Sequence, residues 1–136
     1  MESSSTSSRS STSPAQPNPG DPPILDGDMI RLNLGALGDD AAECLSFLTE
    51  TFAEDTPGLL ANMRKGAEEN DRDLLRMNAH TLKSSSATLG AMLLSHLCLQ
   101  LEVKAKAGDL AGSVELVAQA EQAYEEAKVG LQNFQW

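Results

Sequence analysis

The sequence is poor in the residue types that metal sites and disulfide scaffolds require. Its 136 residues include two cysteines, two histidines, one tryptophan and one tyrosine. Cys44 and Cys98 stand apart among apolar residues at helical spacing, which favours reduced thiols in a core over a disulfide or a metal site. The sequence contains no H-E-x-x-H and no Cys-x-x-Cys. The composition therefore argues against a zinc site.

Long hydrophobic runs and basic residues are also scarce. No stretch approaches the roughly 18 apolar residues of a membrane span, and the first residues lack the apolar segment of a signal peptide. We therefore expect a cytoplasmic location. The net charge is −10, and residues 24–136 hold 18 acidic and 9 basic side chains. This excess argues against nucleic acid and an anionic membrane as partners, and favours a protein with a basic or mixed rim.

The motifs of several enzyme classes are missing as well. There is no G-x-x-x-x-G-K-[ST] and no G-x-G-x-x-G loop to hold a nucleotide. A Ser-His-Asp triad would have to be assembled around His80, whose neighbouring serines share its predicted helix, and no oxyanion hole is evident. The sequence therefore does not predict a complete enzyme.

The first 28 residues are predicted to form a disordered arm or linker. Five of the six prolines lie in residues 1–23, and eight serines lie in residues 1–13. This segment has no apolar pattern, so burial cannot offset the entropy of ordering it. We predict a tether over residues 1–28 and one helical domain over residues 29–136.

The rest of the chain has apolar residues at helical spacing, and β-formers are scarce. We predict a short entry segment over 29–37, followed by five helices. The first two run from Asp39 or Asp40 to about Ala53 and from Thr56-Pro57 to about Asn70. The other three run from Asn70 or Asp71 to Gly90, from about Met92 to Gly108, and from Asp109 onward. In the last helix the predicted core residues are Val114, Val117, Ala120, Tyr124, Ala127 and Leu131. Short connections favour antiparallel packing. The predicted fold is all-α, an antiparallel four-helix bundle with one or two short extra N-terminal helices.

His80 is the strongest candidate for a functional residue. On a helical wheel, Leu75, Leu82 and Leu89 fall about 180–220° from His80, so the ring is predicted to face solvent. A histidine ring is largely neutral near pH 7, and its free nitrogen can attack phosphorus. Lys83, one turn further on, is placed to pair with phosphoryl oxygens. Small residues at Ser84 and Ala87 keep the approach open.

No magnesium ligands are arranged near His80 in the sequence. The metal and most catalytic groups must then come from another protein. We therefore predict a phosphoryl carrier rather than an enzyme, with no cofactor of its own.

One segment resembles a known family. Residues 79–87, AHTLKSSSA, followed by LGA at 89–91, resemble the signature of histidine-containing phosphotransfer (HPt) domains. Residues 52–60, 97–102 and 108–110 extend the likeness, which covers roughly 30–136. The resemblance implies a four-helix bundle and a histidine that exchanges phosphoryl groups with aspartates of receiver domains, in response regulators or hybrid histidine kinases.

The resemblance also implies roles for single residues. His80 matches the phosphorylated histidine, and Lys83 matches the lysine beside it. Ser84 falls where the family usually has glycine, which keeps the site accessible but brings a receiver loop into tighter contact. We expect a monomer, with Mg²⁺ in the partner receiver. We also expect docking on the His80 face through Met77, Thr81, Ala87 and Thr88.

Other interpretations stay open at this stage. His96 is expected to be an ordinary surface or half-buried residue, and Lys83 alone could be a solvated lysine. Ser84 could be a phosphorylation site, whereas Ser85 and Ser86 should point inward and hydrogen-bond locally. The whole bundle could be an adaptor or a decoy in which His80 transfers nothing. It could also be the phosphorylated domain of a chemotaxis-type kinase, freestanding or part of a hybrid kinase.

Overall fold

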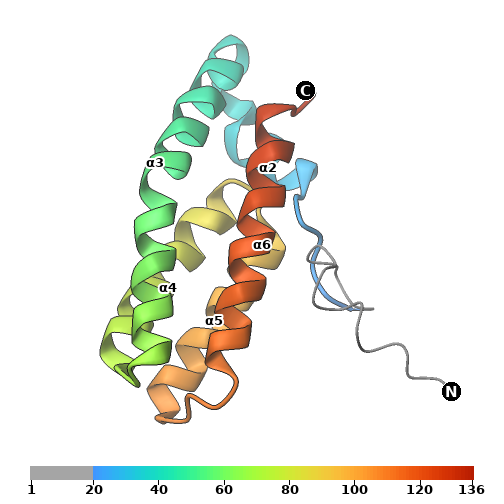
Figure 1. Ribbon diagram of the computed structural model, residues 1–136. Helices are drawn as coiled ribbons and strands as arrows, with labels where there is room; N and C mark the ends of the chain where they lie inside the picture. Colours follow the sequence, from blue (N-terminus) through green and yellow to red (C-terminus); the bar gives the residue numbers. More distant parts are fainter. Residues whose placement is uncertain (1–19) are drawn as a thin grey trace, which may run out of the picture.

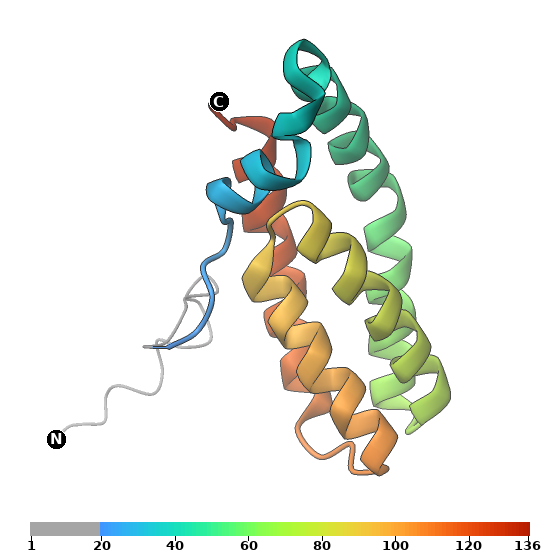
Figure 2. The same ribbon diagram turned by 180° about the vertical axis from the view of Figure 1, so that it is seen from behind.

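The computed structural model describes residues 20–136, so residues 1–19, most of the predicted arm, lie outside the described residues. The elements are α2 (Gly27–Leu34), the 3₁₀ helix η2 (Gly35–Asp40), α3 (Ala41–Glu68), α4 (Arg72–Thr88), α5 (Met92–Ala107) and α6 (Ser113–Gln132). Helices α3 to α6 run up and down in turn, and α2 and η2 lie at one end (Figures 1 and 2). The predicted all-α four-helix bundle is confirmed, and residues 20–136 contain no strand.

Each long helix contributes an apolar stripe to one core. Met63 of α3, Leu82 of α4, Leu101 of α5 and Val117 of α6 are all fully buried. Burying one such side chain contributes about 1.5–3 kcal/mol, so each stripe stabilises the bundle by several kcal/mol. Cys98 is buried in this core and Cys44 is half-buried, and both are free thiols. Burial raises the pKa of the Cys98 thiol, which keeps it protonated and unreactive.

The segment before α2 is held against the bundle. The side chain of Asp26 caps α2 by accepting from the backbone N–H groups of Asp28 and Met29, at 3.0 and 3.2 Å. The Asp26 N–H donates to the carbonyl of Gly90 at 2.8 Å. The part of the predicted arm nearest the domain is therefore tied to the turn that follows α4.

The predicted helix break at Thr56-Pro57 is wrong, because α3 continues through both residues. A proline inside a helix removes the N–H that would donate to the carbonyl four residues earlier, here that of Ala53. The hydroxyl of Tyr124, from α6, donates to this freed carbonyl at 3.4 Å. A tertiary hydrogen bond thus replaces a lost helical one, which sequence signals within α3 could not reveal.

We expect Tyr124→Phe to lower the free energy of unfolding by about 1 kcal/mol, because it leaves the Ala53 carbonyl without a donor. In a Pro57→Ala background, Tyr124→Phe should lower the free energy of unfolding by less than half as much. The alanine N–H can then donate to the Ala53 carbonyl in place of the tyrosine. Urea unfolding of the four proteins, followed by circular dichroism, measures the coupling. Equal costs in both backgrounds would contradict this account of α3.

The last helix also begins later than predicted. Gly112, in the left-handed conformation at φ 78°, precedes α6, and Asp109 caps a turn by accepting from the N–H of Ala111. The prediction that Val114 faces the core is wrong, since it is 38% exposed in the first turn. The other predicted core residues of this helix are buried: Val117, Ala120, Tyr124, Ala127 and Leu131.

Candidate functional site

His80 projects from the middle of α4 on the side away from the core. Its side chain is 61% exposed, whereas Ala79 and Leu82 beside it are fully buried. Leu75 and Leu89, which the helical wheel placed opposite the histidine, are buried as well. The ring is therefore accessible, while its backbone is fixed by the packing of the opposite face of the helix.

The imidazole is hydrogen-bonded to a carboxylate on the neighbouring helix. His80 Nδ1 lies 2.8 Å from Glu102 Oε2, and Lys83 Nζ donates to Glu102 Oε1 at 2.7 Å. Lys106 Nζ lies 3.6 Å from Oε2. The Glu102 side chain is only 5% exposed, so these groups meet beneath the exposed ring.

Helix pairing brings Glu102 to this position. Helices α4 and α5 lie side by side (Figure 2), joined by a tight turn at Gly90, whose φ is 76°. The Ser95 hydroxyl of α5 donates to the carbonyl of Lys83 at 2.9 Å and ties the two helices together. Glu102 follows Ser95 by two helical turns, so it lies on the same side of α5. The register of α4 against α5 therefore places the carboxylate under the histidine.

Glu102 is ionised at neutral pH. The hydrogen bond from Lys83, helped by that from His80 and opposed by burial, lowers the pKa of Glu102 to about 2. An ionised carboxylate only accepts hydrogen bonds, so the proton between the two side chains belongs to His80 Nδ1. A neutral ring then carries its lone pair on Nε2, for which the described residues offer no hydrogen-bond partner. The geometry therefore leaves Nε2 as a free nucleophile.

The lowered pKa of Glu102 predicts acid lability of the fold. Since this pKa is depressed in the folded state, the stabilisation is complete above the unfolded value of about 4.5 and is lost as the pH falls toward 2. The difference corresponds to at most on the order of 3 kcal/mol. Urea titrations between pH 6 and about 2 should show this loss. Glu102→Gln should flatten the curve, and exposed Glu115→Gln should not; parallel curves for Glu102→Gln and the parent would contradict the assignment.

The other residues expected around the site lie along the accessible side of α4. Met77, Thr81, Ser84 and Thr88 are exposed, and Ala87 is half-buried. Thr81 and Thr88 donate to the carbonyls of Met77 and Ser84, each at 3.1 Å. The structure brings Lys83 into the His80–Glu102 network, whereas the Ser84 hydroxyl makes no hydrogen bond to it.

The remaining polar residues near the site have local partners. The Ser85 and Ser86 hydroxyls both donate to the carbonyl of Leu82, at 3.3 and 2.6 Å, as predicted. His96 lies half-buried on α5, and its Nε2 is 2.8 Å from Nε2 of Gln100. Neither serine nor His96 belongs to the His80 network. Residues 20–136 contain no cluster of three or more His, Cys, Asp or Glu placed to hold a metal.

Apolar surface is exposed along α3 and α5, the two helices that pack against α4. A groove of about 260 Å³ between α3 and α4 is lined by Leu59, Thr81 and Thr88 among others. On the α5 side, Leu99 and Val103 are exposed. The accessible nitrogen therefore lies on a face that also offers apolar contact to a protein partner.

Sequence reasoning missed Glu102, Lys106 and this α5 surface. Glu102 is the only acidic residue of α5, and its helical position is close to the apolar stripe. That isolated acid, in a helix with no other acidic residue, was the available signal. Its partners, however, lie on another helix, so no spacing within α5 could identify them.

Comparisons with known proteins agree with this geometry. A model of the Hpt domain family matches residues 48–130. The fold is similar to the crystal structure of histidine-containing phosphotransfer protein B from Pseudomonas aeruginosa PAO1, with a TM-score of 0.72 and 26% identity over 82% of this chain and 93% of that one. It is also similar to the HPT domain of a sensor hybrid histidine kinase from Shewanella, with a TM-score of 0.61 and 18% identity over 83% and 97%. The second likeness concerns the fold alone.

No curated protein matches the sequence. None of the helices in residues 20–136 combines the length and apolar character that a bilayer span needs.

Proposed function

Because this chain belongs to the Hpt domain family, we propose that it carries a phosphoryl group on Nε2 of His80, between aspartates of receiver domains in a multistep phosphorelay. Members of this family are phosphocarriers that act with kinase and receiver components. The observation that carries the proposal is the hydrogen bond from His80 Nδ1 to Glu102, at 2.8 Å. It leaves the lone pair on the exposed nitrogen and holds the ring in one orientation.

The transfer step follows from this arrangement. The Nε2 lone pair attacks phosphorus in the acyl phosphate of a receiver, the new N–P bond forms, and the P–O bond to the aspartate breaks. The aspartate leaves as a carboxylate, and the ring becomes a phosphorylated imidazolium with its proton still on Nδ1. Glu102 stabilises that positive charge. The protonated ring is also a good leaving group, so the same site supports transfer in either direction.

The cations of this network have N–H donors that Glu102 does not occupy. Lys83 uses one N–H toward Glu102, and an ammonium group has three. The remaining donors can bind phosphoryl oxygens and offset their charge in transfer. The proposal leaves magnesium and the other catalytic groups to the receiver. The proposed docking face comprises Met77, Thr81, Ala87 and Thr88, with the apolar surface on either side.

We expect Lys83→Ala to slow phosphoryl transfer about tenfold, because one charge-assisted contact in the transition state is lost. The bundle should stay folded, since Lys83 is partly exposed and Glu102 keeps His80 and Lys106 as partners. Rapid-quench transfer from a phosphorylated receiver measures the rate, and Lys104→Ala, on α5, is the matched control. An unchanged rate would remove Lys83 from the mechanism.

A donor comparison tests the function itself. The chain is incubated with a panel of radiolabelled phosphorylated receivers and, separately, with an autophosphorylating kinase domain of the chemotaxis type. Rapid labelling of His80 by one receiver supports the relay. Labelling only by the kinase domain would assign the chain to that kinase class. Binding of a receiver with no transfer would identify an adaptor or decoy and overturn the proposal.

A further inference from the structure

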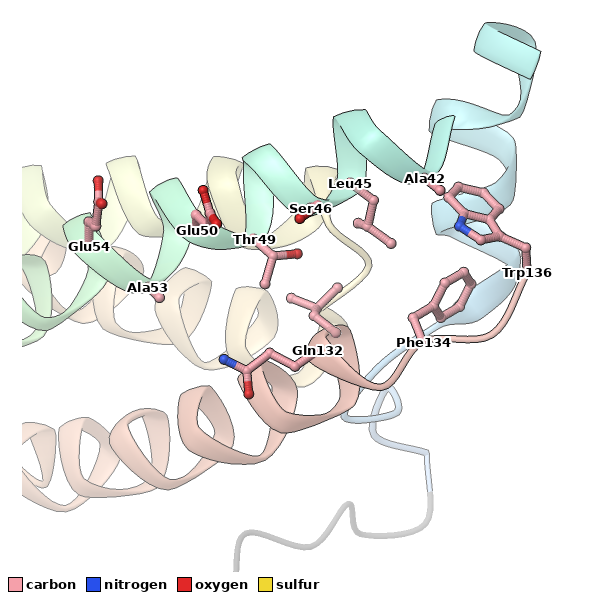
Figure 3. Close-up of a pocket in the computed structure, with 11 residues that line it drawn as sticks. Ala42, Leu45, Ser46, Thr49, Glu50, Ala53, Glu54, Gln132, Phe134 and Trp136 are labelled. Atoms are coloured by element: carbon pink, nitrogen blue, oxygen red, sulfur yellow. The ribbon is translucent and has the colours of Figure 1, made fainter. Parts of the chain in front are cut away.

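A second groove lies between the first half of α3 and the end of α6. It has a volume of about 780 Å³, and its walls include Leu45, Thr49, Glu50 and Glu54 of α3. Phe134 and Trp136 close one end, with their side chains turned toward the helix (Figure 3). It lies on the α6 flank of α3, whereas the groove beside His80 lies on the α4 flank. It is therefore a separate surface from the phosphoryl-transfer site.

A buried hydroxyl in this groove has no partner. Thr49 is 6% exposed, and its Oγ1 has no hydrogen bond within the described structure. Thr81 and Thr88, also in helices, each donate to the carbonyl four residues earlier. Thr49 does not, and its side chain extends from α3 into the groove (Figure 3). Native proteins rarely leave a buried hydroxyl without a hydrogen bond. The Thr49 hydroxyl therefore indicates that a ligand places a polar atom in this groove.

The acidic side chains at the edge of the groove favour a cationic ligand. Glu50 and Glu54 stand one turn apart on the rim and are exposed. Neither has an ion-pair partner among residues 20–136, whereas Arg64 in the same helix pairs with Glu68 and Glu121. A second copy of this chain would bring its own net charge of −10 against this rim. An arginine or lysine from a different protein complements it instead.

The shape of the groove fits a helix. Small side chains face it from α3 at intervals of four, three and four residues: Ala42, Ser46, Thr49 and Ala53. This spacing keeps them on one face, along about 17 Å of helix. That length accommodates about three turns of a partner helix laid between α3 and α6, as in helix-in-groove recognition.

From these observations we propose that the α3–α6 groove binds a basic amphipathic helix of a partner protein. Its apolar face packs against Leu45 and the Phe134–Trp136 pair. Its arginine or lysine side chains pair with Glu50 and Glu54, and one such donor reaches the Thr49 hydroxyl. The partner can stay bound while receivers exchange at His80, because the two surfaces lie on different flanks of α3. The proposal does not depend on phosphoryl transfer.

The single tryptophan of the chain reports on this groove directly. Trp136 is 46% exposed, so an occupant that covers it should shift its emission to shorter wavelength. The probe is a tryptophan-free helical peptide of about 14 residues, with leucines on one face and arginines on the other. A second peptide has glutamates in place of the arginines. We expect a saturable shift with the arginine peptide and none with the glutamate peptide.

Variants separate specific binding from attraction to an acidic protein. Glu50→Gln with Glu54→Gln should weaken peptide binding about tenfold. The matched control, Glu43→Gln with Glu115→Gln, removes two exposed charges outside the groove and should leave binding within about twofold. Thr49→Val should also weaken binding while leaving the melting temperature equal or higher. Binding should survive His80→Gln.

Four results would each overturn the proposal. The first is equal weakening in the groove pair and the control pair, which would mean that the peptide responds to overall charge. The second is a shift with both peptides, and the third is no shift with either. Loss of binding in His80→Gln would assign the peptide to the histidine face instead. None of these results bears on phosphoryl transfer, so the proposed function is tested independently of the groove.

Discussion

His80→Gln should abolish phosphoryl acceptance and leave the melting temperature within about 4 °C of the parent value. Both effects follow from the position of the ring. The side chain is 61% exposed, so its loss removes little buried surface, and the glutamine amide can still donate to Glu102. The same change removes the Nε2 lone pair, and the other nitrogens of the network, those of Lys83 and Lys106, are paired with Glu102.

The measurement is incorporation of phosphate from a labelled receiver, read as acid-labile and base-stable label. Circular dichroism of the same samples checks the fold. His96→Gln is the matched control, because it replaces the other histidine, which hydrogen-bonds within α5 to Gln100. We expect full labelling of that variant. Persistent labelling of His80→Gln at parental levels would place the phosphoryl group elsewhere and overturn the mechanism.

The position of His80 could be predicted because helical periodicity is local information. Leu75, Leu82 and Leu89 recur on one face, and a residue opposite them must face solvent if they form a core. Glu102 could not be predicted in the same way. Its role depends on the register of α5 against α4, set by the turn at Gly90 and by the Ser95 hydroxyl bonded to the Lys83 carbonyl. Such pairings between helices leave no spacing pattern in one sequence.

The errors in the helix boundaries have the same origin. Thr56-Pro57 is a good start signal by local rules, yet α3 passes through it. The decisive partner for the freed Ala53 carbonyl is Tyr124, 71 residues further along the chain. At the start of α6, Asp109 does cap a backbone N–H, that of Ala111, but it caps a turn rather than the helix. The local signal at Asp109 thus identified a real cap but assigned it to the wrong element, whereas the signal at Thr56-Pro57 marks no helix start.

The second large effect is expected from Glu102→Gln, which should slow phosphoryl transfer roughly 10- to 100-fold, by analogy with the carboxylates that orient metal-binding histidines. The parent carboxylate accepts from both Lys83 and His80. A glutamine has one carbonyl oxygen, and its other terminal atom is a donor. If the oxygen faces the ammonium of Lys83, the amide N–H₂ faces His80 Nδ1 and favours the tautomer with the proton on Nε2. That tautomer has its lone pair on Nδ1, facing the amide, and none on the exposed Nε2.

Nitrogen-15 NMR of the His80 ring distinguishes this effect from a merely structural one. In the parent protein at neutral pH, Nδ1 should be the protonated nitrogen; in Glu102→Gln a large fraction should carry the proton on Nε2 instead. The matched control is Glu115→Gln, exposed on α6, which should change neither the ring nor the rate. Since Glu102 acts through His80, the loss of rate should follow the loss of the reactive tautomer. A variant that keeps its fold, transfers phosphate at the parental rate and shows no change in the ring would exclude Glu102 as the residue that positions His80.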